Sequence, residues 1–295
     1  MYKYYQKKDY MIMEYTFDSI TEFLDYLDVA PTNTKIWNGC SLKSKTGSSN
    51  FCRTESFEEA VELCKYGYHE DFQRLVGLKI SLEKYIKLTS KKNKQYNYYV
   101  GYTPDVKAYL DGNPLSMLNR ENPTRRHIDI YYNIGVPWQV TSGQIFNRGA
   151  ITLNLVEILE NMGFSVDLNI FDIGHEDKLI HYAKFNLKKS GERLNIQKLY
   201  FPMCHPSFLR RLLFRLEEVT PDITRDFTDG YGHACDDYTT RDVLDLKEND
   251  MVICLPSEMC VRGENIIDDA NNMFDYINKF TSEDIKFEQV KRLMR

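Results

Sequence analysis

The stretch Ile128-Asp129-Ile130-Tyr131-Tyr132-Asn133-Ile134 opens the segment that decides the fold. Its β-branched and aromatic residues predict a strand. Residues 144–162 then place most of their apolar side chains on one helical stripe, and Gly163 follows where a left-handed helix C-cap is expected. A second strand is predicted at Val166–Phe171. The segment therefore predicts a βαβ unit with two parallel strands and a right-handed crossover.

The turn after the first strand, GVPWQVTSG at residues 135–143, carries no recognisable ligand motif. It has no G-x-G-x-x-G, no P-loop lysine and no D-x-S-x-S metal pattern. Ligands of open α/β sheets usually bind at this carboxyl end of the strands. We therefore expect that this end holds no reactive groups, and the sequence predicts no catalytic residue, no bound metal and no cofactor.

The remaining pattern predicts two parts. Residues 101–295 should form an α/β scaffold domain with a Rossmann-like or von Willebrand A-like sheet, because strands are also indicated at 194–201 and 251–255, with helices after Pro206 and at 266–280. Residues 1–100 should form a smaller N-terminal α+β module. This module includes a helix capped by Asp18 or Ser19 and a second helix that begins with a capping box at Ser56 and Glu59.

Two segments of the N-terminal module are predicted to be loops. Residues 38–50 are rich in Gly, Ser and Lys, which favours a mobile surface segment. Residues 90–99 combine lysines with tyrosines and are expected to form a linker or an extended arm.

Composition excludes several classes of protein. A chain of 295 residues with 42% hydrophobic content can bury a large core, and its formal net charge of -5 gives no general attraction to nucleic acid or anionic lipid. No apolar run approaches the roughly 18 residues that span a bilayer, and the first fifteen residues form no signal peptide. The seven cysteines include no C-x-x-C pair, so reduced thiols and a cytosolic location are expected.

Tyrosine occurs 21 times, and aromatic residues of this kind are enriched where proteins bind each other. Because Tyr200 and Phe201 are expected at the end of a strand, next to Pro202 and Met203, they could anchor a partner at the sheet edge. Core packing is the alternative. In the following helix, Arg210, Arg211 and Arg215 are expected to face outward as a basic ridge. The predicted partner-binding residues are Tyr200, Phe201, Met203, Arg210 and Arg211.

A second group of residues could bind a metal or act in catalysis: His175, His181, Cys204, His205, His233, Cys235, Asp229, Asp236 and Asp237. Their types suit zinc, but the tight ligand pairs of zinc sites are missing. A Cys204 nucleophile with His205 or His233 as base has no local signature. Magnesium could bind the acidic residues between 226 and 237, although an acidic turn with Asx caps explains them equally well.

Four short motifs stand out as capping and turn signals: Phe17-Asp18-Ser19-Ile20-Thr21-Glu22-Phe23, Ser56-Phe57-Glu58-Glu59-Ala60, Pro104-Asp105-Val106-Lys107-Ala108-Tyr109-Leu110-Asp111-Gly112-Asn113-Pro114 and Asn147-Arg148-Gly149-Ala150. In these motifs the chain resembles an uncharacterised family of bacteriophage proteins, and the likeness covers most of its length. In size and non-catalytic character it is also similar to phage inhibitors of the Gabija defence complex, which bind a bacterial nuclease-helicase as an oligomeric shell. The resemblance carries over no catalytic or interface residue.

These observations lead to one expected function and two alternatives. The resemblance implies a phage-encoded, non-catalytic inhibitor in the host bacterial cytoplasm, which binds a Gabija-like anti-phage defence complex through aromatic surfaces. Such an inhibitor is expected to be a homo-oligomer with no membrane or nucleic-acid partner. The alternatives are a metal-dependent phage enzyme acting on nucleic acid or nucleotides, and a von Willebrand A-like adaptor for an AAA+ ATPase.

Overall fold

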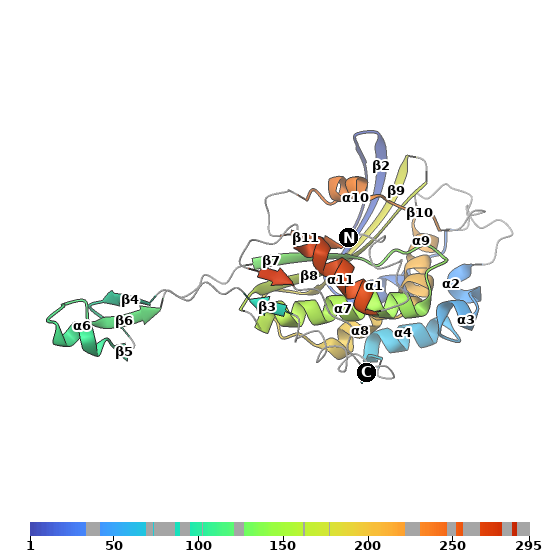
Figure 1. Ribbon diagram of the computed structural model, residues 1–295. Coiled ribbons are helices and arrows are strands. Elements are labelled where there is room, and N and C mark those ends of the chain that lie inside the picture. Colours follow the sequence, from blue (N-terminus) through green and yellow to red (C-terminus); the bar gives the residue numbers. More distant parts are fainter. Residues whose placement is uncertain are drawn as a thin grey trace.

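The fold is seen in a computed structural model (Figure 1), which describes residues 1–33, 42–68, 73, 86–88, 95–101, 103–120, 127–161, 163–176, 178–221, 231–246, 252–255, 266–278 and 285–287. It is a mixed α/β protein built on one large sheet. Six strands follow one another across this sheet in the order β1-β2-β9-β8-β7-β11, and β10 pairs with β8 as the seventh.

The predicted βαβ unit is confirmed. Strand β7 (His127–Asn133), helix α7 (Ser142–Asn161) and strand β8 (Ser165–Glu176) follow one another, and the two strands are parallel. Gly163 has the expected left-handed backbone, with a φ of 89°. On β7, Ile128, Ile130 and Tyr132 point into the main core beneath α7, which is why the unit buries one face of each strand.

The N-terminal strands belong to the same sheet as this unit. Strands β1 (Tyr2–Lys7) and β2 (Tyr10–Phe17) form an antiparallel hairpin, and β2 runs parallel to β9 (Leu179–Lys188), which is antiparallel to β8. The expected boundary at residue 100 is therefore wrong for these strands. Side chains that alternate between the two faces of β2 explain why this strand lies inside the sheet. Tyr15 and Phe17 enter the main core, while Ile12 enters a smaller core on the opposite face.

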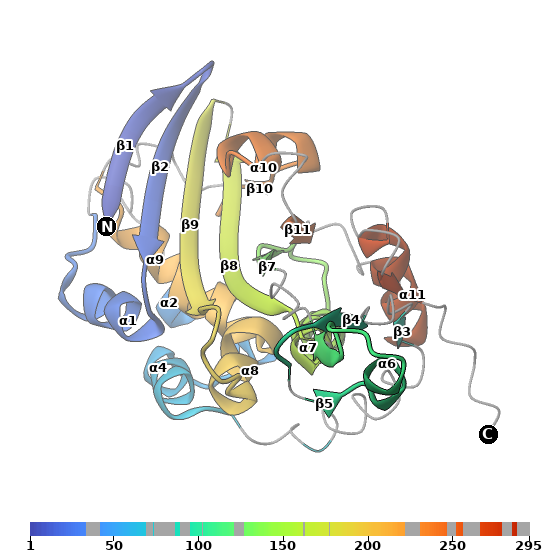
Figure 2. The ribbon, with the colours of Figure 1, turned by 90° about the vertical axis from the view of Figure 1, so that its left-hand side faces the viewer.

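Helices cover one face of the sheet almost completely. The main core contains side chains from α1 (Ile20–Val29), α4 (Phe57–Tyr66), α7, α8 (Ile196–Cys204), the π-helical turn η1 (Phe208–Leu213), α9 (Phe214–Val219) and α11 (Ile266–Ile277). On the opposite face, Val243 of α10 (Asp237–Val243) packs with Phe171 and Ile180. Figure 2 shows α10 at the far end of β8 from α7. Strand β10 (His233–Ala234) precedes α10, and β11 (Val252–Leu255) follows it.

Both predicted N-terminal caps are confirmed. The Ser19 side chain accepts a hydrogen bond from the Glu22 amide at the start of α1, and Ser56 accepts one from the Glu59 amide at the start of α4. The helix predicted to start near Pro206 is also present, although its first turns are π-helical.

The strand predicted at residues 194–201 is wrong, because this segment forms helix α8. Asn195 caps it by accepting a hydrogen bond from the amide of Lys198. Residues 199–204 are all buried, so their unbroken apolar run has neither the alternation of a strand nor the stripe of a surface helix.

The segment predicted as a mobile loop is partly helical and partly buried. Residues Lys43–Thr46 form α2 and Ser49–Cys52 form α3, while residues 34–41 lie outside the described part of the chain. Ser44 and Cys52 are fully buried. Among the described residues, Ser44 and Gly47 are therefore positions of close packing, since a Cβ atom at Gly47 would lie 2.7 Å from Cys52 Sγ.

Two small sheets complete the described structure. Strand β3 (Ile86–Leu88) pairs with β12 (Ile285–Phe287), which joins positions far apart in the sequence. Strands β4 (Gln95–Tyr98), β6 (Met117–Arg120) and β5 (Thr103–Pro104) form the second sheet, next to helix α6 (Val106–Leu110). We call residues 95–120 the arm unit, and Figure 1 shows it set apart from the large sheet.

No helix among the described residues is long and apolar enough to cross a membrane.

Candidate functional site

The aromatic residues predicted to bind a partner lie in the core. Tyr200, Phe201 and Met203 of α8 are each at most 1% exposed. Tyr200 stacks on Tyr68 with ring centroids 5.6 Å apart, and Phe201 stacks on His205 at 4.9 Å. The expectation that they form an exposed sheet edge is therefore wrong, because α8 packs its whole apolar surface between α7 and α4 and leaves none for a partner.

The three arginines predicted to form an outer ridge are also buried. Arg211 donates hydrogen bonds to the Thr54 hydroxyl at 2.7 Å and to the backbone carbonyls of Ser44, Gly47 and Thr54. Arg210 donates to the carbonyls of Phe51 and Val140, both at 2.7 Å. Arg215 donates to the Thr32 hydroxyl and the Ala30 carbonyl. The expectation of a basic surface is wrong because these guanidinium groups turn inward to acceptors on other segments, chiefly the carbonyls of the 42–54 segment, which covers η1.

A buried carboxylate completes this internal network. Glu218 on α9 accepts hydrogen bonds from the Ser44 amide and hydroxyl and from the Tyr231 hydroxyl, and its carboxylate lies 3.9 Å from the Arg215 guanidinium. Burial and the nearby Glu218 charge raise the pKa of Tyr231. The network connects α2, α9 and the residues before β10, so its role is to hold elements together.

Most of the predicted metal or catalytic residues do not converge. Cys204 is buried, and His205 lies on the same packed segment, with its Nδ1 atom accepting from the Ser207 amide. His175 and His233 are cross-strand neighbours whose ring centroids lie 6.1 Å apart. The remaining members are dispersed: the Cys235 thiol is buried, Asp236 caps α10, and Asp229 and the Asp237 side chain lie outside the described part.

His205 provides a pH-dependent contribution to stability. Burial, with a smaller effect of the Arg53 charge, lowers its pKa from 6.5 to about 4. The folded protein thus binds fewer protons than the unfolded chain, so the contribution is complete above pH 6.5 and is lost as the pH falls toward 4. Between pH 7.5 and pH 5, the free energy of unfolding should fall on the order of 2 kcal/mol more in the wild type than in His205→Asn.

Urea unfolding at the two pH values measures this difference. Asparagine can accept the Ser207 hydrogen bond without titrating in this range, and His233→Asn, at an exposed position, is the matched control. An equal pH dependence in His205→Asn and the wild type would contradict the assignment.

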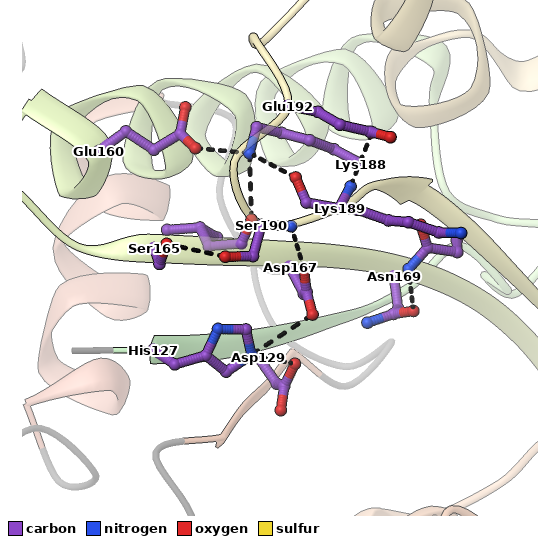
Figure 3. Close-up of polar contacts among 12 residues, drawn as sticks. His127, Asp129, Glu160, Ser165, Asp167, Asn169, Lys188, Lys189, Ser190 and Glu192 are labelled. Carbon is purple, nitrogen blue, oxygen red and sulfur yellow. Dashed lines mark hydrogen bonds and ion pairs between the residues drawn. The ribbon is translucent and has the colours of Figure 1, made fainter. Parts of the chain in front are cut away.

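A polar cluster lies at the amino-terminal ends of β7 and β8 (Figure 3). Asp129 and Asp167 are direct neighbours across the two strands, and the Nε2 atom of His127 lies 3.2 Å from Asp129 Oδ1 and 3.3 Å from Asp167 Oδ2. Asp167 also accepts a hydrogen bond from the Ser190 amide. Opposed like charges destabilise a sheet, and a cation between them relieves the repulsion. Because His127 already bridges both carboxylates at a half-exposed position, the cluster is explained without a ligand.

The arm unit presents the strongest candidate for a functional surface. Six large apolar side chains are exposed there, from 39% for Tyr98 to 79% for Val100, and these are half of the twelve in the described part of the chain. We call these six the arm surface: Tyr98, Tyr99, Val100, Val106, Tyr109 and Leu110. Sequence reasoning placed an arm at residues 90–99 but missed α6, which supplies the other half of the surface.

Local interactions explain how the arm unit holds its shape although few of its described side chains are buried. Asp105 caps α6 by accepting a hydrogen bond from the Ala108 amide, and Gly112 ends the helix with a φ of 73°. A Cβ atom at Gly101 would lie 2.3 Å from the Leu118 carbonyl oxygen, so the close approach to β6 requires glycine. Among the described side chains from 98 to 118, only Ala108 is buried. The unit is thus hydrogen-bonded, but its described side chains bury little apolar surface that could stabilise it.

Comparison with known proteins finds one family. A family model described as a domain of unknown function, DUF7192, matches residues 5–281. No curated protein matches the chain. No solved structure matches it either.

Proposed function

We propose that this chain, which belongs to the DUF7192 family of domains of unknown function, is a non-catalytic binding protein that holds a partner protein through its arm surface. The observation that carries the proposal is that six exposed apolar side chains lie within residues 98–110, on a unit whose described side chains from 98 to 118 bury only Ala108. Large apolar residues exposed together indicate an interaction site.

The free energy of burying apolar surface favours a partner that covers the arm unit. A three-stranded sheet needs a buried apolar face or a packed helix to be stable, and α6 buries only Ala108. Covering apolar surface contributes about 25 cal/mol per Å². A partner that covers the arm surface would therefore stabilise the unit and gain affinity at the same time. Tyrosine suits this role, because its ring is largely apolar while its hydroxyl tolerates water.

We further propose that the partner is a bacterial anti-phage defence complex of the Gabija-like nuclease-helicase kind. The resemblance of the chain to bacteriophage proteins and Gabija inhibitors supports this choice. The net charge of -5 also favours a protein partner over nucleic acid. On this proposal the chain acts in the host bacterial cytoplasm, and its expected homo-oligomer would present several arms at once, which increases avidity.

The large sheet would serve as the scaffold of this binding protein. Strands β8, β7 and β11 are parallel, and the helices that precede β8 and β11, α7 and α10, pack on opposite faces. This arrangement supports the proposed kinship to Rossmann-like or von Willebrand A-like sheets. A rigid sheet of this kind carries the arm on a stable base.

The test is binding to a purified Gabija-like complex. The wild-type chain should co-elute with the complex and lower its nuclease activity at stoichiometric concentration. A variant carrying Tyr99→Ser, Tyr109→Ser and Leu110→Ser should bind at least about 100-fold more weakly, because interface anchors each contribute 2 kcal/mol or more. Its melting temperature should change little, since these side chains are exposed.

The matched control carries Val29→Ser, Tyr66→Ser and Tyr238→Ser. These three side chains are 77–79% exposed, much like those of the arm variant, but lie on the main body. The control should bind like the wild type. If the arm variant binds with wild-type affinity, the arm surface is excluded as the binding site. If the wild type does not bind, the defence complex is excluded as the partner. Light scattering of the wild type and the arm variant, without any partner, tests whether the arm surface instead binds a second copy of this chain.

A further inference from the structure

Three ionisable side chains that are distant in the sequence meet inside the protein. Asp172 of β8, His181 of β9 and Glu217 of α9 each offer one donor atom, and these atoms all lie within 4.8 Å of one another. All three residues are buried, with exposures of 7%, 2% and 4%. The sequence predicted His181 as a candidate metal ligand. It did not indicate Asp172 or Glu217 as candidates.

The cluster reaches the carboxyl end of β7, where α/β sheets usually bind ligands. A Cβ atom at Gly135, just after β7, would lie 2.4 Å from Asp172 Oδ1 and 3.1 Å from Asn133 Oδ1. Asn133 is fully buried, and its Nδ2 atom has no hydrogen-bond partner among the described residues. The carboxyl ends of parallel strands are where open α/β sheets bind ligands. Asp172 thus brings a carboxylate close to this end of β7.

The donor set matches the ligands of a zinc-class metal ion. Zinc accepts imidazole nitrogen and carboxylate oxygen at about 2.0–2.2 Å in a tetrahedral arrangement, so ligand atoms around one ion lie about 3.3–3.6 Å apart. The donor atoms of the cluster, which lie within 4.8 Å of one another, would close around an ion by shifts of at most about 1.5 Å. Two carboxylates are costly to bury, and a divalent cation between them offsets that cost.

We propose that Asp172, His181 and Glu217 bind a divalent transition-metal ion of the zinc class. The ion would connect α9 to β8 and β9, and would therefore stabilise the scaffold. This role goes beyond partner binding and does not depend on it, because no residue of the arm surface takes part.

Metal content and thermal stability of the full chain test the proposal. The protein is freed of metal with a chelator, mixed with zinc chloride, and washed before its metal is measured by mass spectrometry. The wild type should retain about one zinc per chain, and zinc should raise its melting temperature by several degrees. Both effects should be lost in His181→Gln, and cobalt should give a visible absorption band in the wild type but not in this variant.

His127→Gln is the matched control, because it removes the histidine of the other acidic cluster and leaves this one intact. It should bind zinc like the wild type. Asp172→Asn provides a second variant in case His181→Gln does not fold. The proposal is overturned if the apo wild type takes up neither zinc, manganese nor cobalt, if the two variants keep the wild-type stoichiometry, or if His127→Gln alone loses the metal.

Discussion

Replacing Arg211 with methionine is expected to lower the free energy of unfolding by about 3–5 kcal/mol. The guanidinium is fully buried and donates four hydrogen bonds to the segment that carries α2 and α3. Methionine fills much of the volume but leaves the Ser44, Gly47 and Thr54 carbonyls without these donors. Buried carbonyl groups that lose their partners each cost about 1–3 kcal/mol.

Urea unfolding followed by circular dichroism measures this loss. The matched control is Arg193→Met, at an exposed position, which should change the unfolding free energy by less than about 0.5 kcal/mol. Amide exchange should also rise first in residues 42–54, since these depend directly on Arg211. A stability within 1 kcal/mol of the wild type would show that water replaces the guanidinium, and that the network contributes little.

Gly149→Ala is expected to destabilise the protein by about 2–3 kcal/mol, although alanine is the better helix former. A Cβ atom at this position in α7 would lie 2.2 Å from the Met203 carbonyl oxygen and 2.7 Å from Cys204 Sγ. The clash is with backbone, so a side-chain rotation cannot relieve it. Helix α8 would have to move away from α7 and disturb the main core between them.

Gly143→Ala, in the first turn of the same helix, is the control for helix propensity. Its Cβ would meet nothing closer than Thr141 Oγ1 at 3.9 Å, so this change should be neutral or stabilise by up to about 1 kcal/mol. Thermal unfolding of the two variants separates packing from propensity. Equal melting temperatures would mean that α8 is not held against Gly149 as the structure describes.

Local signals predicted the βαβ unit and the helix caps correctly. At β7, α7 and β8, apolar periodicity and the turn at Gly163 point to the same structure, so neighbours in the sequence suffice. Ser19 and Ser56 act within one turn of their helices, which is also a local effect. Periodicity failed at α8, because residues 199–204 are all buried and so have no polar face to mark their period.

The predicted contact residues failed for a different reason. The types of Tyr200, Phe201, Arg210 and Arg211 suit an interface, but the same types also suit a core and its buried carbonyl groups. Which role applies depends on the segments that cover them. Residues 42–54 cover the two arginines from more than 150 positions away in the chain, and α4 and α7 cover the two aromatic residues. Exposure at Tyr109 and Leu110 is likewise decided by the small size of the arm unit and not by any local pattern.

The sequence by itself determined the mixed α/β class, the central βαβ unit and the helix starts, because these depend on interactions within one or two turns of the chain. Only the tertiary structure decided that the N-terminal hairpin extends the same sheet, that the arginines face inward, that the arm surface is uncovered, and that Asp172, His181 and Glu217 meet. Each of these depends on which distant segments pack together, and side-chain chemistry alone does not specify that.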